Sequence, residues 1–253
     1  MFLEIDMGNS RIKWRFRDAS NVLDKGFIET TAEFDLLAAF WLPYAGRVTV
    51  VWVASVVSDD LEQKLAECVK RIFAIDPIFA RSGPNVGVVQ NGYDSPDLLG
   101  VDRWLSILAA YGYTQTACIV LSLGTAATID VIDKNGRHLG GFIAPGLSLM
   151  IRSLSSSARR ISANSHEIVL TEELGRATSL AICGGCTSML EGLVDNAVKQ
   201  LRKVAGDEHF ELVFTGGDAI QLMPYYPSAH LINDLVMDGL AYALQESIPG
   251  CNQ

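Results

Sequence analysis

The sequence predicts an α/β protein built as two similar lobes that face a shared cleft. Strand and helix patterns alternate along its 253 residues, and 49% of these residues are hydrophobic, which is enough to bury a sizeable core. A buried strand that runs into a glycine turn and then into a second strand occurs twice, at residues 5–10 and 121–126. Internal repetition constrains a whole architecture. The alternative is two ordinary hairpins in an α/β protein.

The first lobe is expected to begin with three strands. Residues 2–6 form a short apolar run, and residues 11–17 alternate apolar and basic side chains, which is the period of a half-buried strand. Residues 25–30 form the third strand. A helix is expected at residues 31–42, a buried strand at residues 48–53, and then a helix with Ser58 as its N-cap and acidic residues in its first turn.

The second lobe is expected to repeat this order after a loop at residues 82–97 and a helix at residues 100–111. A buried strand at residues 117–123 precedes a hairpin of residues 127–133 and 137–143. Asn135 and Gly136 predict a type I′ turn between those two strands. The remaining expected elements are helices at residues 146–155, 171–201 and 233–245 and a strand at residues 211–214.

Charge and cysteine content narrow the class of protein. Twenty Lys and Arg against 29 Asp and Glu give a net charge of −9. This argues against a protein that coats nucleic acid or an anionic membrane, because such binding needs clustered basic residues. The N-terminus lacks a signal-peptide pattern, and no segment approaches the ~20 apolar residues of a membrane-spanning helix. Five scattered cysteines fit a reducing compartment, so we expect a cytoplasmic protein.

Two glycine turns have the composition of a phosphate site. Gly8-Asn9-Ser10 and Gly124-Thr125-Ala126 follow buried strands, and successive backbone N–H groups bind anions without formal positive charge. Asp6 stands just before the first turn, where a carboxylate organises Mg²⁺, and Lys13 is placed to reach the same anion. The alternative is that Asp6 caps a hairpin and Lys13 lies on a solvated strand face. Neither turn matches the Walker A pattern.

A carboxylate beside a guanidinium opens the helix expected at residues 100–111. Asp102 is placed to accept a proton from a substrate hydroxyl, and Arg103 to bind a substrate carboxylate. The alternative is a surface ion pair in a first helical turn. Gly216 and Gly217 stand between a strand and a short helix, where they let a ligand approach the backbone. A plain strand-to-helix turn is the competing explanation.

The run Cys183-Gly184-Gly185-Cys186 invites a redox or zinc hypothesis. The sequence has no second pair of this spacing and no histidine at ligand spacing, so we expect these small residues to allow close helix packing at an interface. Arg159 and Arg160 lie in a serine-rich loop and are expected to be solvated.

Taken together, these motifs resemble those of the type III pantothenate kinases, members of the acetate kinase, sugar kinase, Hsp70 and actin superfamily. The resemblance spans essentially the whole chain, and its motifs come in order. Residues 6–10 are similar to the family's first phosphate motif, and residues 100–103 to its substrate and catalytic motif. Residues 124–126, with residues 140–146 after them, are similar to the second phosphate motif. Residues 215–218 are similar to the adenosine motif, and Asp238-Gly239-Leu240 to the family's last helix. Each motif alone is weak, but four in register are specific.

The resemblance implies two ribonuclease H-like lobes of the actin-like ATPase type, residues 1–115 and residues 116–253, the second with a dimerisation helix. It implies a homodimer that transfers the γ-phosphoryl group of ATP to pantothenate, giving 4′-phosphopantothenate, the first step of coenzyme A biosynthesis. Asp102 is then the general base, and Asp6 organises Mg²⁺. The implied pantothenate-binding residues are Tyr93, Gly100, Val101, Arg103 and, from the neighbouring subunit, Thr178. The implied ATP-binding residues are Asp6, Met7, Gly8, Asn9, Ser10, Arg11, Ile12, Lys13, Thr125, Gly216 and Gly217.

Two positions depart from the family's pattern. The family commonly has Asp at the position of Ser122, where it helps bind an activating monovalent cation. Ser offers only a neutral oxygen, so we expect K⁺ or NH₄⁺ to bind weakly, differently or not at all. Ala177 stands where relatives often have a polar residue before the Thr. The alternatives are a non-catalytic regulator of the same fold, similar to the Bvg accessory factor, and a kinase or phosphatase with another small substrate.

Overall fold

The computed structural model describes residues 1–19, 21–31, 33–157, 170–171, 173–206 and 208–244. By their internal contacts these residues form two units. Unit 1 consists of Met1–Val86, Tyr93–Ala109 and the chain from Leu235, and unit 2 consists of Gly87–Gly92 and Ala110–Asp234. The division falls inside helix α3 (Val101–Thr114), and the chain returns to unit 1 with helix α6 (Leu235–Leu244). The lobe boundary expected after residue 115 stays a prediction.

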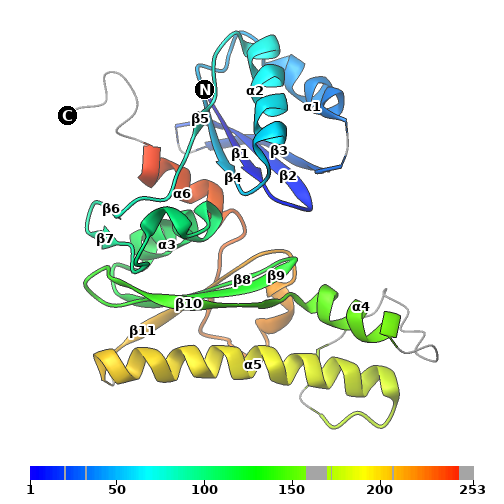
Figure 1. Ribbon diagram of the computed structural model, residues 1–253, viewed down its shortest axis with the longest axis vertical. Helices are drawn as coiled ribbons and strands as arrows, with labels where there is room; N and C mark the ends of the chain where they lie inside the picture. The colour runs from blue at the N-terminus through cyan, green and yellow to red at the C-terminus, as the bar shows by residue number, and fades with distance from the viewer. Residues whose placement is uncertain (20, 32, 158–169, 172, 207, 245–253) are drawn as a thin grey trace. The chain divides into compact units, whose positions relative to one another are not determined.

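Unit 1 is built on a five-stranded sheet with the order β3-β2-β1-β4-β5. Its strands are β1 (Phe2–Met7), β2 (Arg11–Asp18), β3 (Asn21–Glu29), β4 (Val50–Ser55) and β5 (Ile78–Phe79). Strands β1, β2 and β3 form an antiparallel meander, and β4 and β5 add in parallel on the other side of β1. Helix α1 (Phe34–Trp41) precedes β4 and helix α2 (Asp59–Phe73) follows it, which is the order that the sequence predicts (Figure 1).

Alternation along the strands separates the two faces of this sheet. One face forms the core with α1 and α2, and it contains Leu3, Ile5, Met7, Ile12, Trp14, Phe16, Leu37, Trp41, Leu65, Val69 and Phe73. The other face carries the charged residues Glu4 and Asp6 of β1 and Lys13 and Arg15 of β2. The expectation of a half-buried strand is wrong at Arg15, which is only 6% exposed. Its burial follows from α6, which contacts β1 and β4 and forms an ion pair with Arg15.

Unit 2 repeats the sheet with the order β10-β9-β8-β11-β12. Its strands are β8 (Ala117–Leu123), β9 (Ala126–Ile132), β10 (His138–Pro145), β11 (Phe210–Thr215) and β12 (His230–Leu231). Strand β8 pairs antiparallel with β9 and parallel with β11, as β1 pairs with β2 and β4. The duplication that the two glycine turns predicted is therefore confirmed in the sheet topology.

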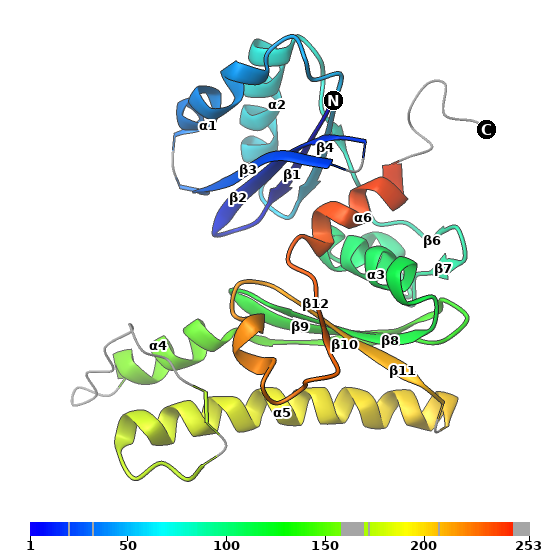
Figure 2. The same ribbon diagram turned by 180° about the vertical axis from the view of Figure 1, so that it is seen from behind.

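Two helices complete unit 2, α4 (Leu147–Ser157) and α5 (Thr178–Ala205). Figure 2 shows the long α5 running along the sheet of this unit. Leu190, Val194, Ala197 and Leu201 are buried on α5 at spacings of three and four residues, which is the stripe of a helix that covers a core. These side chains join the core of unit 2 with the apolar face of β8 and β9.

Helix α5 begins seven residues later than the sequence predicts. The Thr171 hydroxyl accepts the backbone N–H of Glu173 at 3.1 Å, and the Thr171 N–H donates to Thr187 Oγ1 at 3.2 Å. Such side-chain bonds offer the backbone an alternative to a helix. Gly175 also lies so close to α5 that an added Cβ would stand 2.1 Å from the nitrogen of Ala181. Together these contacts hold the segment outside the helix.

Asn135 and Gly136 do join a hairpin, but the predicted type I′ turn is wrong. A type I′ turn needs positive φ at both central residues, and of this pair only Gly136 has one, at +81°. The Gly136 N–H donates to Asp133 O at 3.0 Å, and the Asp133 N–H to Arg137 O at 2.9 Å. The Asp133 carboxylate also accepts the N–H groups of Asn135 and Arg137. The side chain of Asp133 therefore stabilises a three-residue loop that ends on a left-handed glycine.

The remaining differences are small. Ser58 is the N-cap of α2, but its backbone carbonyl, not its side chain, accepts the N–H groups of Leu61 and Glu62. Several unpredicted elements are too short to show a period, namely the strands β5, β6 (Asn85–Val86), β7 (Val89–Gln90) and β12 and the 3-10 helices Leu42–Tyr44 and Pro96–Leu98. Arg159 and Arg160 lie outside the described residues. Among the helices that are described, none has the length and hydropathy of a membrane span.

The two cysteines of the Cys183–Cys186 run have different surroundings. Cys186 is buried in the core of unit 2, and Gly184 faces the backbone of Thr171 and Glu173 in the same chain. These two positions pack within their own unit, and the interface expected for this run stays a prediction. Gly185 is exposed, and an added Cβ there would meet none of the described atoms within 4 Å.

The buried thiol of Cys118 on β8 makes stability depend on pH. Burial raises the pKa of this thiol from 9.0 to about 12, because little hydration is left to the thiolate. The unfolded chain loses the proton at the ordinary value, so the free energy of unfolding falls as pH rises from about 9 towards about 12. We expect urea unfolding of Cys118→Ala to show a shallower pH dependence than that of the parent and of a Cys183→Ala control. Equal slopes in the three proteins would contradict this.

Candidate active site

The first glycine turn joins β1 to β2 in unit 1. The Gly8 N–H donates to Arg11 O at 3.0 Å, and the Thr30 hydroxyl donates to Gly8 O at 2.7 Å. The Thr30 N–H donates to Ser10 O at 3.0 Å, so Thr30, the residue after β3, holds the turn at Gly8 and at Ser10. Asn9 and Ser10 are exposed. The turn is thus a fixed backbone loop with accessible polar residues, as an anion site requires.

Asp6 and Lys13 face each other beside this turn. They are cross-strand partners in the register of β1 and β2, with Lys13 Nζ 3.4 Å from Asp6 Oδ2. The Asp6 side chain is only 14% exposed. The side chains of Met7 and Ile12 are fully buried, which leaves only their backbone for a ligand. Arg11 is exposed and lies 3.8 Å from Glu29, so the structure does not bring its side chain to Asp6.

Asp102 occupies the first turn of α3, which also belongs to unit 1. Its Oδ1 accepts the backbone N–H of Arg103 at 2.8 Å, so the carboxylate lies against the start of the helix. An added Cβ at Gly100 would stand 2.8 Å from that oxygen, so a side chain there would displace the carboxylate. Val101 is buried. The carboxylate itself is partly exposed and can meet a substrate.

The buried Arg103 pairs with the half-buried Tyr93 next to Asp102. Arg103 is 6% exposed, its Nη1 donates to the Tyr93 hydroxyl at 2.7 Å, and its guanidinium lies 5.6 Å from the centre of the Tyr93 ring. The alternative of a surface ion pair between Asp102 and Arg103 is therefore wrong. A guanidinium oriented in this way is ready to bind a carboxylate.

The hydroxyl of Tyr93 is expected to matter for substrate affinity. Tyr93→Phe removes the acceptor of the 2.7 Å bond and leaves one N–H of the buried Arg103 without this partner. The loss of a hydrogen bond to a charged group costs about 1.5–3 kcal/mol. We expect the KM for the acceptor substrate to rise roughly tenfold with a smaller change in kcat. Tyr113→Phe, an exposed tyrosine on α3, is the control, and a Tyr93→Phe protein with the parental KM would contradict this role.

In unit 2 the second glycine turn is enclosed by two other glycines. An added Cβ at Gly146, which precedes α4, would stand 2.0 Å from Gly124 O, and one at Gly216 would stand 2.3 Å from Leu123 O. The Gly146 N–H donates to Thr125 O at 3.0 Å. The structure therefore brings together three motifs that are far apart in the sequence. Thr125 and Gly217 are exposed in this cluster, which offers backbone groups to a ligand.

Ser122 stands on β8 at the position that Asp6 has on β1, two residues before the glycine. Its neighbours in register are Thr128 on β9 and Thr215 on β11, so three hydroxyl residues form a row across the sheet. The Thr215 hydroxyl donates to Asn233 O at 3.5 Å. This row supplies neutral oxygens only. Thr178, the first residue of α5, also belongs to unit 2 and is exposed.

Sequence reasoning gave no role in the site of unit 1 to three charged residues. Glu4, Arg15 and Asp238 form an ion network on the same face of the sheet as Asp6. A signal was available in β1 and β2, because Glu4 and Arg15 are charged residues in strands that are otherwise mostly apolar. The partner Asp238 was not predictable, since it lies 223 residues from Arg15 along the chain.

Comparisons with known proteins point to one family. The profile of the family described as "Type III pantothenate kinase" matches residues 2–200. A type III pantothenate kinase from Azotobacter vinelandii is 38% identical over 251 residues, which cover 96% of this chain and 98% of the relative.

Solved structures show the fold. A Baf family protein from Campylobacter jejuni is 22% identical with a TM-score of 0.65, covering 97% of this chain and 98% of that chain. MreB 5 of Spiroplasma citri, bound to AMPPNP, is 10% identical with a TM-score of 0.51, covering 97% and 96%. These likenesses and the repeated sheet confirm the expected α/β fold of two ribonuclease H-like lobes of the actin-like type. With the profile and the sequence relative, they place this chain in a family: it belongs to the type III pantothenate kinases.

Proposed function

We propose that this pantothenate kinase uses Asp102 as the general base and Arg103 as the anchor of its acceptor substrate. The observation that carries the proposal is the start of α3, where a partly exposed carboxylate stands beside a buried guanidinium held by Tyr93. Pantothenate carries both a carboxylate and a primary hydroxyl. A base and an anion-binding guanidinium in adjacent positions suit these two groups.

The reaction transfers the γ-phosphoryl group of ATP to that hydroxyl. Arg103 binds the carboxylate of pantothenate, with Tyr93, Gly100 and Val101 around it, and Asp102 accepts the hydroxyl proton as the oxygen attacks the γ-phosphorus. The bond from phosphorus to the oxygen bridging the β- and γ-phosphates breaks, and ADP leaves. Positioning and charge neutralisation supply most of the rate enhancement in such reactions. The Asp102 base adds typically 10²–10⁴-fold.

Asp6 fits a role in organising Mg²⁺. Its carboxylate is mostly buried on the polar face of the sheet and stands at the edge of the Gly8 turn, and Mg²⁺ commonly takes one or two protein carboxylates together with substrate phosphates. When bound, Mg²⁺ neutralises the charge of the phosphates. Lys13, 3.4 Å from the same carboxylate, adds a second positive charge.

The residues proposed to bind ATP are those that the family resemblance implies, and they offer backbone groups. In unit 1 these come from residues 6–13, around the turn that Thr30 holds. In unit 2 they come from Thr125, Gly216 and Gly217, in the cluster that also includes Gly146. A chain of net charge −9 can bind ATP in this way, because backbone donors and a few cations act locally.

We further propose a cytoplasmic homodimer in which Thr178 of one subunit completes the pantothenate pocket of the other. Thr178, Gly185 and Met189 follow one another on α5 at spacings of seven and four residues, so they share one face of the helix, and all three are exposed. An exposed helix face with a glycine in it can accept a close protein partner. The acidic net charge does not favour nucleic acid or an anionic membrane as a partner.

The test of the function is an acceptor assay. The purified protein is incubated with ATP, Mg²⁺ and pantothenate, with and without K⁺ or NH₄⁺, and 4′-phosphopantothenate is measured by mass spectrometry. A panel of other hydroxyl compounds tests for a different acceptor. Binding of ATP without turnover of any acceptor would favour the non-catalytic regulator and overturn the proposal.

The Ser122 row predicts weak dependence on a monovalent cation. Three hydroxyl residues replace the carboxylate that a cation site commonly has, so the turnover of the parent is expected to change less than about twofold when K⁺ replaces a bulky organic cation. Ser122→Asp is expected to introduce a clear dependence, because a carboxylate binds such cations more strongly than a hydroxyl. Ser148→Asp, on α4, is a control for added charge. A parent that needs K⁺ for activity would contradict this prediction.

A further inference from the structure

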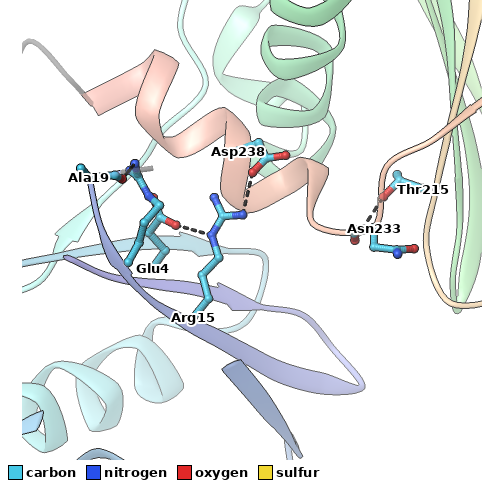
Figure 3. Close-up of polar contacts among 7 residues, drawn as sticks. Glu4, Arg15, Ala19, Thr215, Asn233 and Asp238 are labelled. Carbon is cyan, nitrogen blue, oxygen red and sulfur yellow. Dashed lines mark hydrogen bonds and ion pairs between the residues drawn. The ribbon is translucent and has the colours of Figure 1, made fainter. Parts of the chain in front are cut away.

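The motif Asp238-Gly239-Leu240 has no part in the proposed chemistry. Its first residue, Asp238, is the last member of a mostly buried ion network in unit 1. Glu4 on β1 is fully buried, and Arg15 opposite it on β2 is 6% exposed. Arg15 donates through Nε to Glu4 and through Nη1 to Asp238 Oδ1, the second bond at 2.6 Å. Figure 3 shows the guanidinium of Arg15 between the two carboxylates. One side chain therefore links the sheet to α6.

The charges of this network are balanced. Arg17 donates to Glu4 Oε1 through Nε at 3.1 Å and through Nη2 at 2.9 Å, so two guanidinium groups face two carboxylates. Burial lowers the pKa of Arg15, but attraction by Glu4 and the hydrogen bonds to Glu4 and Asp238 outweigh it and raise that pKa above its usual value. Both Arg15 bonds are thus made by a charged group. A planar guanidinium with two fixed partners defines where α6 stands along the sheet.

The next residue of α6 touches α3. An added Cβ at Gly239 would stand 2.2 Å from Leu105 O and 2.6 Å from Leu105 C, so the backbones of the two helices are in contact. Leu105 is in the same first turns of α3 as Asp102, whose carbonyl accepts the Ser106 hydroxyl at 2.8 Å. A shift of α6 would therefore be passed to the helix that carries the proposed base.

The sheet side of the network adjoins Asp6. Side chains alternate along a strand, so Glu4 and Asp6 lie on one face, as do Arg15 and Lys13 opposite them. On this face the cross-strand pair Glu4–Arg15 is the neighbour of the pair Asp6–Lys13. The network thus connects the strands that carry the proposed phosphate side of the site to the helix that carries its acceptor side, all within unit 1.

From these contacts we infer that Asp238 is a positioning residue for phosphoryl transfer, which rests on the proposed function. Through Arg15 it holds α6 in register on β1 and β2, and through Gly239 α6 holds α3, so that Asp102 keeps its place relative to Asp6 and the first glycine turn. Tyr93, Asp102 and Arg103 are joined to each other at the start of α3 and move together. A displaced α3 therefore keeps its affinity for pantothenate and loses alignment with the phosphate.

The inference predicts a division between kcat and KM. A misplacement of about 1 Å in a reacting group can lower the rate about 10²-fold. Asp238→Asn keeps the shape of the side chain and removes its charge, and we expect kcat to fall roughly 10- to 100-fold with the KM for pantothenate within about twofold of the parent. Asp238→Glu, which keeps the charge, is expected to recover part of kcat. Gly239→Ala, which forces α6 away from Leu105, is expected to lower kcat as Asp238→Asn does.

The control is Arg17→Gln, which breaks two hydrogen bonds to the same Glu4 without touching α6. Its kcat is expected to stay within about twofold of the parent. All four tryptophans, Trp14, Trp41, Trp52 and Trp104, are buried in unit 1, so their fluorescence measures the folded fraction of each variant. Each kcat is then expressed per folded molecule, which removes any effect of stability alone.

The outcomes separate this inference from the proposed function. A parent without pantothenate phosphorylation overturns the function itself. An active parent whose Asp238→Asn and Gly239→Ala variants keep kcat within about twofold per folded molecule overturns the positioning role. So does an equal loss of kcat in Arg17→Gln, because the network would then act only through the stability of the sheet.

Discussion

Asp102→Asn is expected to lower kcat about 10²–10⁴-fold, the usual contribution of a general base. Asparagine keeps an oxygen that accepts the Arg103 N–H, the bond that Asp102 Oδ1 makes at 2.8 Å. The start of α3 and the Arg103–Tyr93 pair therefore stay in place, and the KM for pantothenate is expected to change little. Steady-state kinetics with saturating ATP measure both constants.

The matched control for this variant is Asp97→Asn. Asp97 is an exposed carboxylate in the 3-10 helix just before α3, so its substitution removes the same charge a few residues away. It is expected to leave kcat unchanged. If Asp102→Asn keeps a kcat near that of the parent while it binds pantothenate, Asp102 is not the base, and the proton passes to another group or directly to the phosphate.

Much of the fold was predictable because its determinants are local. The alternation in residues 11–17 and the apolar run at residues 117–123 each predict a strand from a few consecutive residues, and both strands are confirmed. The two glycine turns predicted a duplicated architecture, and the equal strand orders of the two sheets confirm it. The turn at Asn135 and Gly136 was misassigned because the Asp133 side chain, outside the two-residue signal, decides its geometry.

The parts that sequence alone did not predict depend on contacts between distant segments. The sequence predicts that Arg15 lies on the exposed face of a half-buried strand. In the structure it is buried, because α6, near the end of the chain, packs against that face. The closeness of Gly100 to Asp102 was predictable, because both residues belong to one short motif. The enclosure of the Gly124 turn by Gly146 and Gly216 was not predictable, because the sequence does not indicate which backbone a glycine will approach.

That enclosure predicts a large loss of stability for Gly216→Ala. Gly216 has a φ of +96°, which an alanine adopts only with strain, and its new Cβ would stand 2.3 Å from Leu123 O. The same carbonyl accepts the Asp218 N–H at 3.2 Å, so the clash also displaces that bond. Left-handed strain and overpacking each cost about 1–3 kcal/mol. We expect the free energy of unfolding to fall by about 3 kcal/mol or more.

The neighbouring Gly217 provides the control, because the same added methyl group meets nothing within 4 Å there. Gly217→Ala is expected to change the free energy of unfolding by less than about 0.5 kcal/mol, as surface substitutions usually do. Calorimetry is the suitable measurement, since the tryptophans lie in unit 1 and do not follow unit 2. In the folded fraction, the displaced Leu123–Gly124 backbone is expected to raise the KM for ATP in Gly216→Ala. The KM for pantothenate is expected to stay nearly constant, because Tyr93 and Arg103, its proposed partners, lie in unit 1 and Thr178 lies on α5, away from the Gly124 turn in the sequence. Equal unfolding temperatures for the two variants would mean that the Gly216 backbone relaxes without cost, and the close approach would then have no role in shaping the turn.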